Sequence, residues 1–412
     1  MRKYLVIPSL ILSIALFTSL STYSQETESR KGSLVDRLKQ SNKEKLDKVK
    51  RQVDDIRKDI LARNLKFRVG ITEQIKMKIE EITGARVPKD VKNTAPAEAK
   101  RGEKDFANSI KHDKKKGKRL VRKKVKAPKG NAWDLKNESD ETSGEESYYY
   151  YFFTDESTED TSTEDKNKKY EAVDEEKISD QEINKNYRLD ERADPRAKSF
   201  SWLNMNKLSP IKNQGQCGSC WAFTSHGVFE ASYLIVNNKT LDLSEQQIVD
   251  CSGGGSCSGG WYSKVFDYYK MTGPADETTY PYRGVDQQCK STRQRTTRVA
   301  AWGWVTGQQW SAETPVDQMK QALCKYGPIA ACVKVTPAFQ AYVGGIFDEH
   351  AAVSGPSDIN HAIVIVGWDD SKKAYLMRNS WGTGWGEKGY MWIEYGCNNI
   401  GAYAVWMTAA QE

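Results

Sequence analysis

A glycine-rich turn with one cysteine stands directly before an apolar run that begins with a second cysteine. The turn covers residues 213–219 and contains Cys217, and the apolar run begins at Cys220. If this run opens a helix, Cys220 meets free backbone N–H groups and the positive end of the helix dipole. Both lower the pKa of a thiol, and the thiolate is the nucleophilic form. Cys220 is therefore placed for covalent attack, and Cys217 is free to brace the turn.

A thiol nucleophile needs a base, and the chain has only four histidines. Three stand in less suitable places: His112 in a basic block, His226 in the middle of the predicted helix, and His350 in a polar loop. His361 directly precedes an apolar run, residues 362–368, that predicts an interior strand. An imidazole at the mouth of a buried strand suits a general base.

Asn379 follows the next predicted strand, with Trp381 two residues further on. The amide can accept a hydrogen bond from an imidazole and fix its tautomer, and the indole can shield that bond from water. Taken singly, a histidine at a strand end is usually structural, and an asparagine there usually serves a turn. The hypothesis of a nucleophilic site depends on the three groups together.

The elements that must position these groups begin at about residue 200, where apolar and aromatic residues become frequent. The patterns predict helices at 220–236, after Ser244 and between 314 and 327, and strands at 329–335, 362–368, 374–378, 390–394 and 403–407. Helices first and strands later favour an α+β fold in two layers or lobes. About 215 residues suffice for a sizeable core.

The leader, residues 1–192, differs in composition from the rest. The chain has 62 basic and 55 acidic residues, a net charge of +7, whereas residues 193–412 hold 19 of each. The basic excess therefore lies in the leader, and the C-terminal half gives no support for nucleic-acid binding. All eight cysteines lie between Cys217 and Cys397.

The leader itself has three predicted parts. Residues 1–24 read as a cleavable secretory signal, which predicts an extracytoplasmic protein (extracellular, periplasmic or in a lysosome-like compartment) without a stable membrane anchor. Residues 25–91 predict a helical prosegment. Residues 92–192 combine a basic block with an acidic, Ser- and Thr-rich block and predict a largely disordered linker. The aromatic run at 148–153 is either a plug for a groove or a locally sticky piece of that linker.

The region from about 200 to 412 resembles the papain-type cysteine proteases. The motifs that carry the resemblance are Cys217-Gly218-Ser219-Cys220-Trp221, Leu243-Ser244-Glu245-Gln246, Cys257-Ser258-Gly259-Gly260, Asn360-His361-Ala362 and Asn379-Ser380-Trp381-Gly382. The family's fold has a mainly helical N-terminal lobe and a β-barrel-like C-terminal lobe, with the active site in the cleft between them. The resemblance thus implies a peptidase domain at 193–412.

The resemblance also implies roles. Cys220 is the nucleophile, His361 the base and later the acid, and Asn379 orients the imidazole. Gln214 forms the oxyanion hole with the backbone N–H of Cys220. The implied substrate-binding residues are Gly259, Gly260, Trp261, Cys332, Ala362 and Trp385. The implied reaction is peptide hydrolysis through a thioester, with no cofactor and no metal.

Finer expectations follow from the same matches. Uncharged side chains at Trp261, Cys332 and Ala362 predict a preference for an apolar P2 residue. The two-histidine occluding insertion of carboxydipeptidase relatives is missing, which favours an endopeptidase. Expected partners are protein or peptide substrates and the leader as an intramolecular inhibitor, with the enzyme a monomer. A transpeptidase or ligase, or a non-catalytic peptide-binding module, remains an alternative.

The family matches pair Cys217 with Cys257 and Cys251 with Cys289. Cys324, Cys332 and Cys397 then remain besides Cys220. The usual partner of Cys397 is missing, because alanines and a valine occupy residues 351–353. A Cys324–Cys397 bridge is an open alternative, which would leave Cys332 as a free thiol in the substrate pocket.

Overall fold

The computed structural model describes residues 9–112, 118–126, 147–155, 170–174, 177–292, 294–307 and 311–411. The chain forms two compact units, Met1–Ile56 and Arg57–Glu412. The described part of the first unit belongs to helix α1 (Ser9–Arg63). The predicted signal at 1–24 is helical from Ser9 onward, and residues 1–8 lie outside the described residues. Among the helices described, none combines the length and apolar character needed to cross a membrane.

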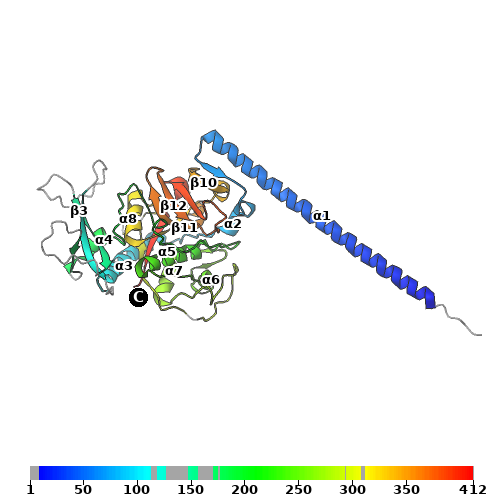
Figure 1. Cartoon of the computed structure of the whole chain (residues 1–412), viewed down its shortest axis with the longest axis horizontal. Helices are drawn as coiled ribbons and strands as arrows, with labels where there is room; N and C mark the ends of the chain where they lie inside the picture. The colour runs from blue at the N-terminus through cyan, green and yellow to red at the C-terminus, as the bar shows by residue number, and fades with distance from the viewer. Residues whose placement is uncertain are drawn as a thin grey trace, which may run out of the picture. The chain divides into compact units, whose positions relative to one another are not determined.

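In the second unit, helices dominate the first part of the predicted peptidase domain and strands the second, as expected for an α+β fold (Figure 1). The helices and 3-10 turns of this domain are α5 (Cys220–Asn237), α6 (Glu245–Cys251), α7 (Tyr262–Met271), α8 (Val316–Tyr326), α9 (Pro337–Gln340), η3 (Pro356–Asp358) and η4 (Cys397–Asn399). The predicted helix at 220–236 is therefore found with one residue more. Ser244 caps α6 by accepting a hydrogen bond from the backbone N–H of Gln247 at 3.0 Å.

The main sheet has the strand order β1-β10-β13-β12-β11-β9-β14-β8, with β5 paired to β11. Its strands are β1 (Phe67–Val69), β5 (Ser199–Ser201), β8 (Val299–Trp304), β9 (Ile329–Val333), β10 (Tyr342–Phe347), β11 (His361–Asp369), β12 (Ala374–Arg378), β13 (Tyr390–Glu394) and β14 (Ala402–Ala409). A small hairpin joins β6 (Gly255–Ser256) and β7 (Gly259–Gly260). Strand β11 lies inside the sheet and is buried over residues 361–368, so its first residue is held rigidly at the strand mouth.

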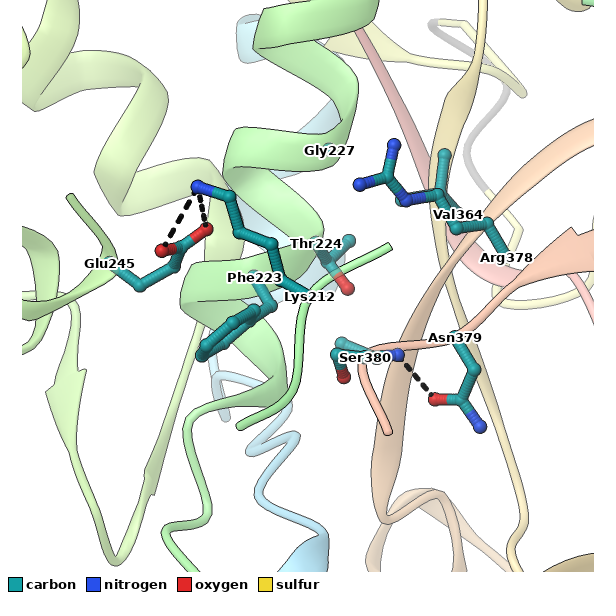
Figure 2. Close-up of a pocket in the computed structure, with 10 residues that line it drawn as sticks. Lys212, Phe223, Thr224, Gly227, Glu245, Val364, Arg378, Asn379 and Ser380 are labelled. Atoms are coloured by element: carbon teal, nitrogen blue, oxygen red, sulfur yellow. Dashed lines mark hydrogen bonds and ion pairs between the residues drawn. The ribbon is translucent and has the colours of Figure 1, made fainter. Parts of the chain in front are cut away.

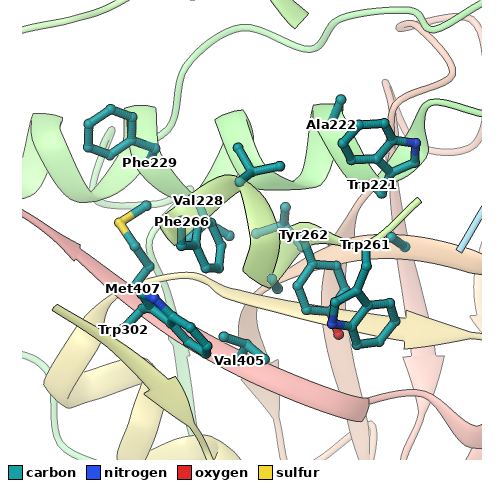
Figure 3. Close-up of a cluster of buried hydrophobic side chains, with 14 of the residues drawn as sticks. Trp221, Ala222, Val228, Phe229, Trp261, Tyr262, Phe266, Trp302, Val405 and Met407 are labelled. Carbon is teal, nitrogen blue, oxygen red and sulfur yellow. The ribbon is translucent and has the colours of Figure 1, made fainter. Parts of the chain in front are cut away.

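The core joins the two lobes through α5. Figure 3 shows Val228 and Phe229 of α5 facing Phe266 of α7 and Met407 of β14. These side chains are buried within one continuous cluster that also includes Cys220. Burial of apolar surface is the main stabilising contribution in folding. The helix that carries the candidate nucleophile is therefore anchored in a large buried apolar cluster.

The described parts of the leader contain more regular structure than predicted. They form η1 (Gln74–Lys76), α2 (Ile79–Ile82), α3 (Val91–His112), β2 (Lys118–Lys126), β3 (Ser147–Asp155), β4 (Glu171–Ala172) and α4 (Asp180–Asn186). The prediction of a largely disordered segment at 92–192 is wrong for these residues. The prediction was based on the local composition of each segment. A basic segment that lacks apolar surface by itself can obtain it from another part of the leader.

Strand β3 supplies the apolar surface that the basic strand β2 lacks. The two strands pair antiparallel over their whole length. Tyr150 and Phe152 pack with Val121, and the guanidinium of Arg122 lies 4.9 Å from the ring centre of Tyr149. The aromatic run at 148–153 is therefore the partner of a basic strand, and neither of the two interpretations from sequence described it.

Two disulfides are present among the described residues. They join Cys217 to Cys257 and Cys251 to Cys289, the pairs that the resemblance implied. Cys324 and Cys397 are both buried with free thiols, so the suggested bridge between them is wrong. Cys324 belongs to α8 and Cys397 to η4. The spacing of the two cysteines along the chain does not show whether these elements lie side by side.

Candidate active site

Cys220 is the first residue of α5, at the position where the helix dipole acts on its sulfur. The preceding turn is held by the Cys217–Cys257 disulfide and by a hydrogen bond from the N–H of Gly218 to the carbonyl of Cys257 at 2.8 Å. The sulfur of Cys220 accepts a hydrogen bond from the backbone N–H of Ala362 at 3.4 Å. The thiol of one lobe thus lies beside the residue that follows His361 in the other.

His361 and Asn379 meet across neighbouring strands. The imidazole Nε2 lies 2.8 Å from the amide oxygen Oδ1 of Asn379, and the backbone N–H of Ser380 donates to the same oxygen at 2.8 Å. Because an amide oxygen only accepts, Nε2 carries the hydrogen and Nδ1 keeps its lone pair. Nδ1 is buried and has no hydrogen-bond partner among the described residues. This tautomer leaves the lone pair of Nδ1 free to accept a proton, as a general base requires.

The ring of Trp381 covers this pair. Its centroid lies 4.8 Å from that of His361, and only 2% of the Trp381 surface is exposed. Exclusion of water strengthens the hydrogen bond between the imidazole and the amide. The thiol, the imidazole, the amide and the indole that the sequence singled out are therefore together in one buried place.

Gln214 is held with its amide pointing into the same place. Its side-chain oxygen accepts from the hydroxyl of Ser380 at 2.5 Å, which fixes the NH₂ group on the other side. The hydroxyl of Tyr282 donates to the carbonyl of Gln214 at 2.9 Å and lies 2.7 Å from that of Ser219. Sequence reasoning assigned no role to Ser380 or Tyr282, although both belong to the motifs it had noted.

The leader occupies the space in front of these residues. We call residues 66–86 the cleft strap. Its first part pairs through β1 with β10, and its middle binds Gln340 and Trp381 through Gln74. The Gln74 side chain donates to the carbonyl of Trp381 at 3.1 Å, and the Gln340 side chain donates to the carbonyl of Gln74 at 2.8 Å.

The carbonyl oxygen of Ile82, in the cleft strap, is bound by two side chains of the candidate site. It accepts hydrogen bonds from the side-chain amide of Gln214 and from the indole N–H of Trp381, each at 3.2 Å. Donors aimed at a carbonyl oxygen beside a nucleophile are the arrangement of an oxyanion hole. Gln214 therefore already acts as a donor to a peptide carbonyl in this structure.

The end of the cleft strap adds a short strand at Gly260. The carbonyl of Gly84 accepts from the backbone N–H of Gly260 at 2.8 Å. The backbone N–H of Arg86 donates to the carbonyl of Gly260 at 3.0 Å. The pairing of Ala85 with Gly260 is parallel. The backbone of Gly260 thus pairs with an extended segment of the leader, in the geometry of strand addition.

The other predicted substrate-binding residues lie at two places. Trp261, Cys332 and Ala362 are buried in the same apolar cluster as Ala85, and Ala362 pairs with Cys332 across β11 and β9. The ring of Trp385 lies 5.1 Å from that of Trp381. Their role in binding a substrate stays a prediction.

A polar pocket lies behind Asn379 and Ser380, between α5 and strands β11 and β12 (Figure 2). Its charged groups have partners: Lys212 lies 3.0 Å from a carboxylate oxygen of Glu245, and Arg378 donates to Ser209 at 3.0 Å. Buried charges that are paired in this way indicate a structural network between the lobes. The paired residues that line this pocket hold the strand ends that carry Asn379 and Ser380.

Burial sets the ionisation of the pair while the leader is in place. It raises the pKa of the Cys220 thiol to about 11, against hydrogen bonds from Ala362 and Gly84 that lower it. It lowers the pKa of His361 to about 4, against the hydrogen bond to Asn379 that raises it. Both shifts favour the neutral form, because charge is costly in a dry site. In the intact chain, burial therefore disfavours both the thiolate and the imidazolium.

We expect Cys220 to react slowly with iodoacetamide in the intact chain, about tenfold faster per pH unit up to its pKa of about 11. After removal of the cleft strap, water returns and the helix N-terminus favours the thiolate, so labelling near pH 6 should rise at least about 100-fold. Peptide mass spectrometry of Cys220 measures both rates. Equal pH profiles before and after removal would contradict this account.

Comparison with known proteins places this geometry in a family. The family described as papain family cysteine protease matches residues 196–409, more than half of the chain. The chain is 37% identical over 222 residues to thiol protease aleurain of Arabidopsis thaliana, a match that covers 52% of this chain and 60% of that protein. It is 36% identical over 217 residues to pro-cathepsin H of Mus musculus, covering 51% and 64%.

Digestive procathepsin L 3 of Tenebrio molitor matches with a TM-score of 0.47 at 32% identity, over 52% of this chain and 71% of that chain. The chain spans less than two thirds of the length of the two relatives named above, thiol protease aleurain and pro-cathepsin H. The chain belongs to the papain family of cysteine proteases.

Proposed function

We propose that the protein is a papain-like cysteine endopeptidase, made as a proenzyme, with Cys220, His361, Asn379 and Gln214 as its catalytic residues. One observation carries the proposal. The Cys220 thiol, the oriented imidazole of His361 and the Gln214 amide converge where the amide already binds a peptide carbonyl, that of Ile82.

The proposed reaction begins with proton transfer from the Cys220 thiol to Nδ1 of His361. The thiolate attacks the substrate carbonyl carbon, and the negative oxygen is held by Gln214 and the backbone N–H of Cys220. The imidazolium then gives its proton to the leaving amine, and the peptide C–N bond breaks to leave a thioester. Water, deprotonated by His361, hydrolyses the thioester and restores the thiol. An amine in place of water would make the protein a transpeptidase or ligase.

Asn379 has a positioning role in this scheme, and its loss should change a pH profile. Its hydrogen bond raises the pKa of His361 by stabilising the imidazolium. Asn379→Ala should therefore shift the basic limb of the kcat/KM profile to lower pH and lower its maximum about fivefold, the equivalent of one hydrogen bond of about 1 kcal/mol. Unchanged limbs would argue against this role.

The cleft strap is the proposed inhibitor. It runs parallel to Gly259–Gly260 and leaves the Ile82 carbonyl in the oxyanion position while the site stays dry and neutral. The relatives named as procathepsins are consistent with a proenzyme. Adding residues 25–192 in trans to processed enzyme should slow hydrolysis. No slowing would remove this part of the proposal.

The finer properties rest on the pocket and on the cysteines. Trp261, Cys332 and Ala362 offer uncharged surface, which supports an apolar P2 residue. The disulfides at Cys217 and Cys251 support an oxidising, extracytoplasmic location. We propose protein or peptide substrates, a monomeric enzyme, and a peptidase domain at 193–412 preceded by a signal at 1–24.

The deciding experiment uses the purified full chain at acidic and neutral pH, with and without an epoxide thiol inhibitor. Peptides that differ at P2 test specificity, and an added amine nucleophile separates transfer from hydrolysis. Thiol-dependent cleavage that Cys220→Ala abolishes is the expected result. Absence of such cleavage under every condition would overturn the proposal, and peptide binding without cleavage would indicate a binding module.

A further inference from the structure

The leader contacts the predicted peptidase domain in two separate places. The first is the cleft strap, residues 66–86. The second comprises helix α3, the small sheet of β2, β3 and β4, and helix α4, and we call it the docked module. Residues 87–90 join the two. Figure 1 shows α3 and α4 beside α8, with β3 beyond them.

Helix α3 packs closely on the edge strand β8. A side-chain Cβ at Gly102 would lie 2.0 Å from the carbonyl oxygen of Trp302, so the two backbones touch. The indole N–H of Trp304 donates to the carboxylate of Glu98 at 2.9 Å. Lys270 of α7 adds an ion pair with Asp105 at 2.5 Å. This is contact of the kind found inside a domain.

An aromatic cluster closes the other end of α3. Phe106 is 1% exposed and packs edge-on against Tyr326 of α8 and Trp406 of β14, with ring centres 4.9 and 5.8 Å apart. Tyr187, which follows α4, packs on the same ring at 5.6 Å. Removing the docked module would therefore expose a large aromatic surface on the peptidase domain.

The docked module is also continuous with the peptidase domain at its C-terminal end. The N–H of Arg188 donates to the carbonyl of Tyr151 in β3 at 2.7 Å, and the N–H of Leu189 donates to the carbonyl of Cys324 in α8 at 3.0 Å. Lys325 is buried and donates to the carbonyl of Asn184. Successive residues thus tie the module to the domain without a flexible joint.

The two connections differ in how open they are to a protease. At residues 87–90, Lys89 and Asp90 are exposed. Within the described chain, the N–H groups of Val87, Lys89 and Asp90 donate to no backbone carbonyl. The carbonyls of Pro88 and Asp90 accept hydrogen bonds from the first turn of α3 and from no other described element. Proteolysis needs a segment that can leave its surroundings and enter a cleft, and such a segment is present here.

Residues 193–200, at the start of the expected peptidase domain, are embedded instead. Ala193 is 1% exposed, and Phe200 lies in β5, which pairs with β11. The carbonyl of Ala197 accepts from the indole N–H of Trp368 at 3.0 Å, and the carbonyl of Lys198 accepts from the backbone N–H of Asp370 at 2.8 Å. A cut here would require β5 to leave the main sheet.

We propose that activation cuts the leader within residues 87–90 and that the active enzyme keeps the docked module, from residue 91 onward, as a permanent part. The inference rests on the proposed function and names its processing site. A second peptidase molecule hydrolyses one peptide bond of this segment with one water, and the cleft strap then leaves with α1. The docked module stays, because its described contacts with β8, α7, α8 and β14 are made by its own residues and not by the cleft strap.

The test uses the full chain. During activation, an epoxide thiol inhibitor labels Cys220, and intact mass and N-terminal sequencing define the labelled species. We expect a new N-terminus at residue 88, 89 or 90, with the residues of the docked module co-eluting with the label in native gel filtration. A labelled enzyme that begins at 193–200 and has lost residues 91–192 would overturn the inference.

Two engineered full chains provide the matched control. One carries the recognition sequence of a specific protease between Lys89 and Asp90, and the other carries it between Asp194 and Pro195. The first should be cut quickly under native conditions and the second at least about 100-fold more slowly. Equal rates would refute the inference. These readouts require no hydrolysis of a substrate by the enzyme, so a failure of the proposed function is seen separately.

Discussion

Cys220→Ala should lower kcat/KM of the processed enzyme by at least about 10⁴-fold, the scale on which other covalent hydrolases lose activity without their nucleophile. The reason is geometric. Cys220 is the sulfur at the start of α5 and beside Ala362, so no other thiol can take its place. Active-site titration and steady-state kinetics on a peptide substrate measure the loss.

A cysteine control separates chemistry from packing. Cys397→Ala also removes a buried thiol, but in η4, away from His361 and Gln214. It should keep its kcat/KM, and any loss should be of thermal stability. Both variants should bind the cleft strap as the wild-type chain does. If Cys397→Ala lost activity as completely as Cys220→Ala, the assignment of the nucleophile would be wrong.

The candidate site could be predicted from sequence because each of its residues stands at the end of a strongly patterned element. Cys220 begins an apolar helix and His361 begins an apolar strand, so the periodicity that identifies the element also places the residue. The support for Gln214 was not predictable in the same way. Ser380 and Tyr282 act through single hydrogen bonds across loops, which leave no periodic trace.

The leader shows the opposite case. Strand β2 is basic and has little apolar surface, whereas β3 is a run of aromatic residues. Each strand provides the surface that the other lacks only when the two pair, about 30 residues apart in the chain. Helix α3 likewise depends on Trp302 and Trp304, about 200 residues later in the chain. Local composition records neither partner, so the prediction of disorder followed correctly from its premises and was wrong for the described residues.

The second large effect is expected at Gly84 of the cleft strap. A Cβ there would lie 1.8 Å from the carbonyl oxygen of Gly218, a backbone atom of the turn before Cys220. Neither backbone can retreat, because Gly218 is held by Cys257 and Gly84 by Asn360 and Gly260. Gly84→Val should therefore lift this part of the strap out of the cleft.

The size of the effect follows from the bonds that are lost. Displacing Gly84 and Ala85 breaks three backbone hydrogen bonds, to Asn360 twice and from Gly260. At about 1 kcal/mol each, the intact chain should bind its own strap about 100-fold less tightly. We therefore expect the unprocessed Gly84→Val chain to react about 100-fold faster with an epoxide thiol inhibitor at Cys220.

Glu80→Ala is the matched control, because Glu80 is an exposed residue of α2 in the same strap. It should label as slowly as the wild-type chain. Intact mass spectrometry at early times distinguishes label on the unprocessed chain from label on processed enzyme. Slow labelling of Gly84→Val on a chain that is folded by circular dichroism would show that the strap does not restrict Cys220, and autoinhibition would then need another cause.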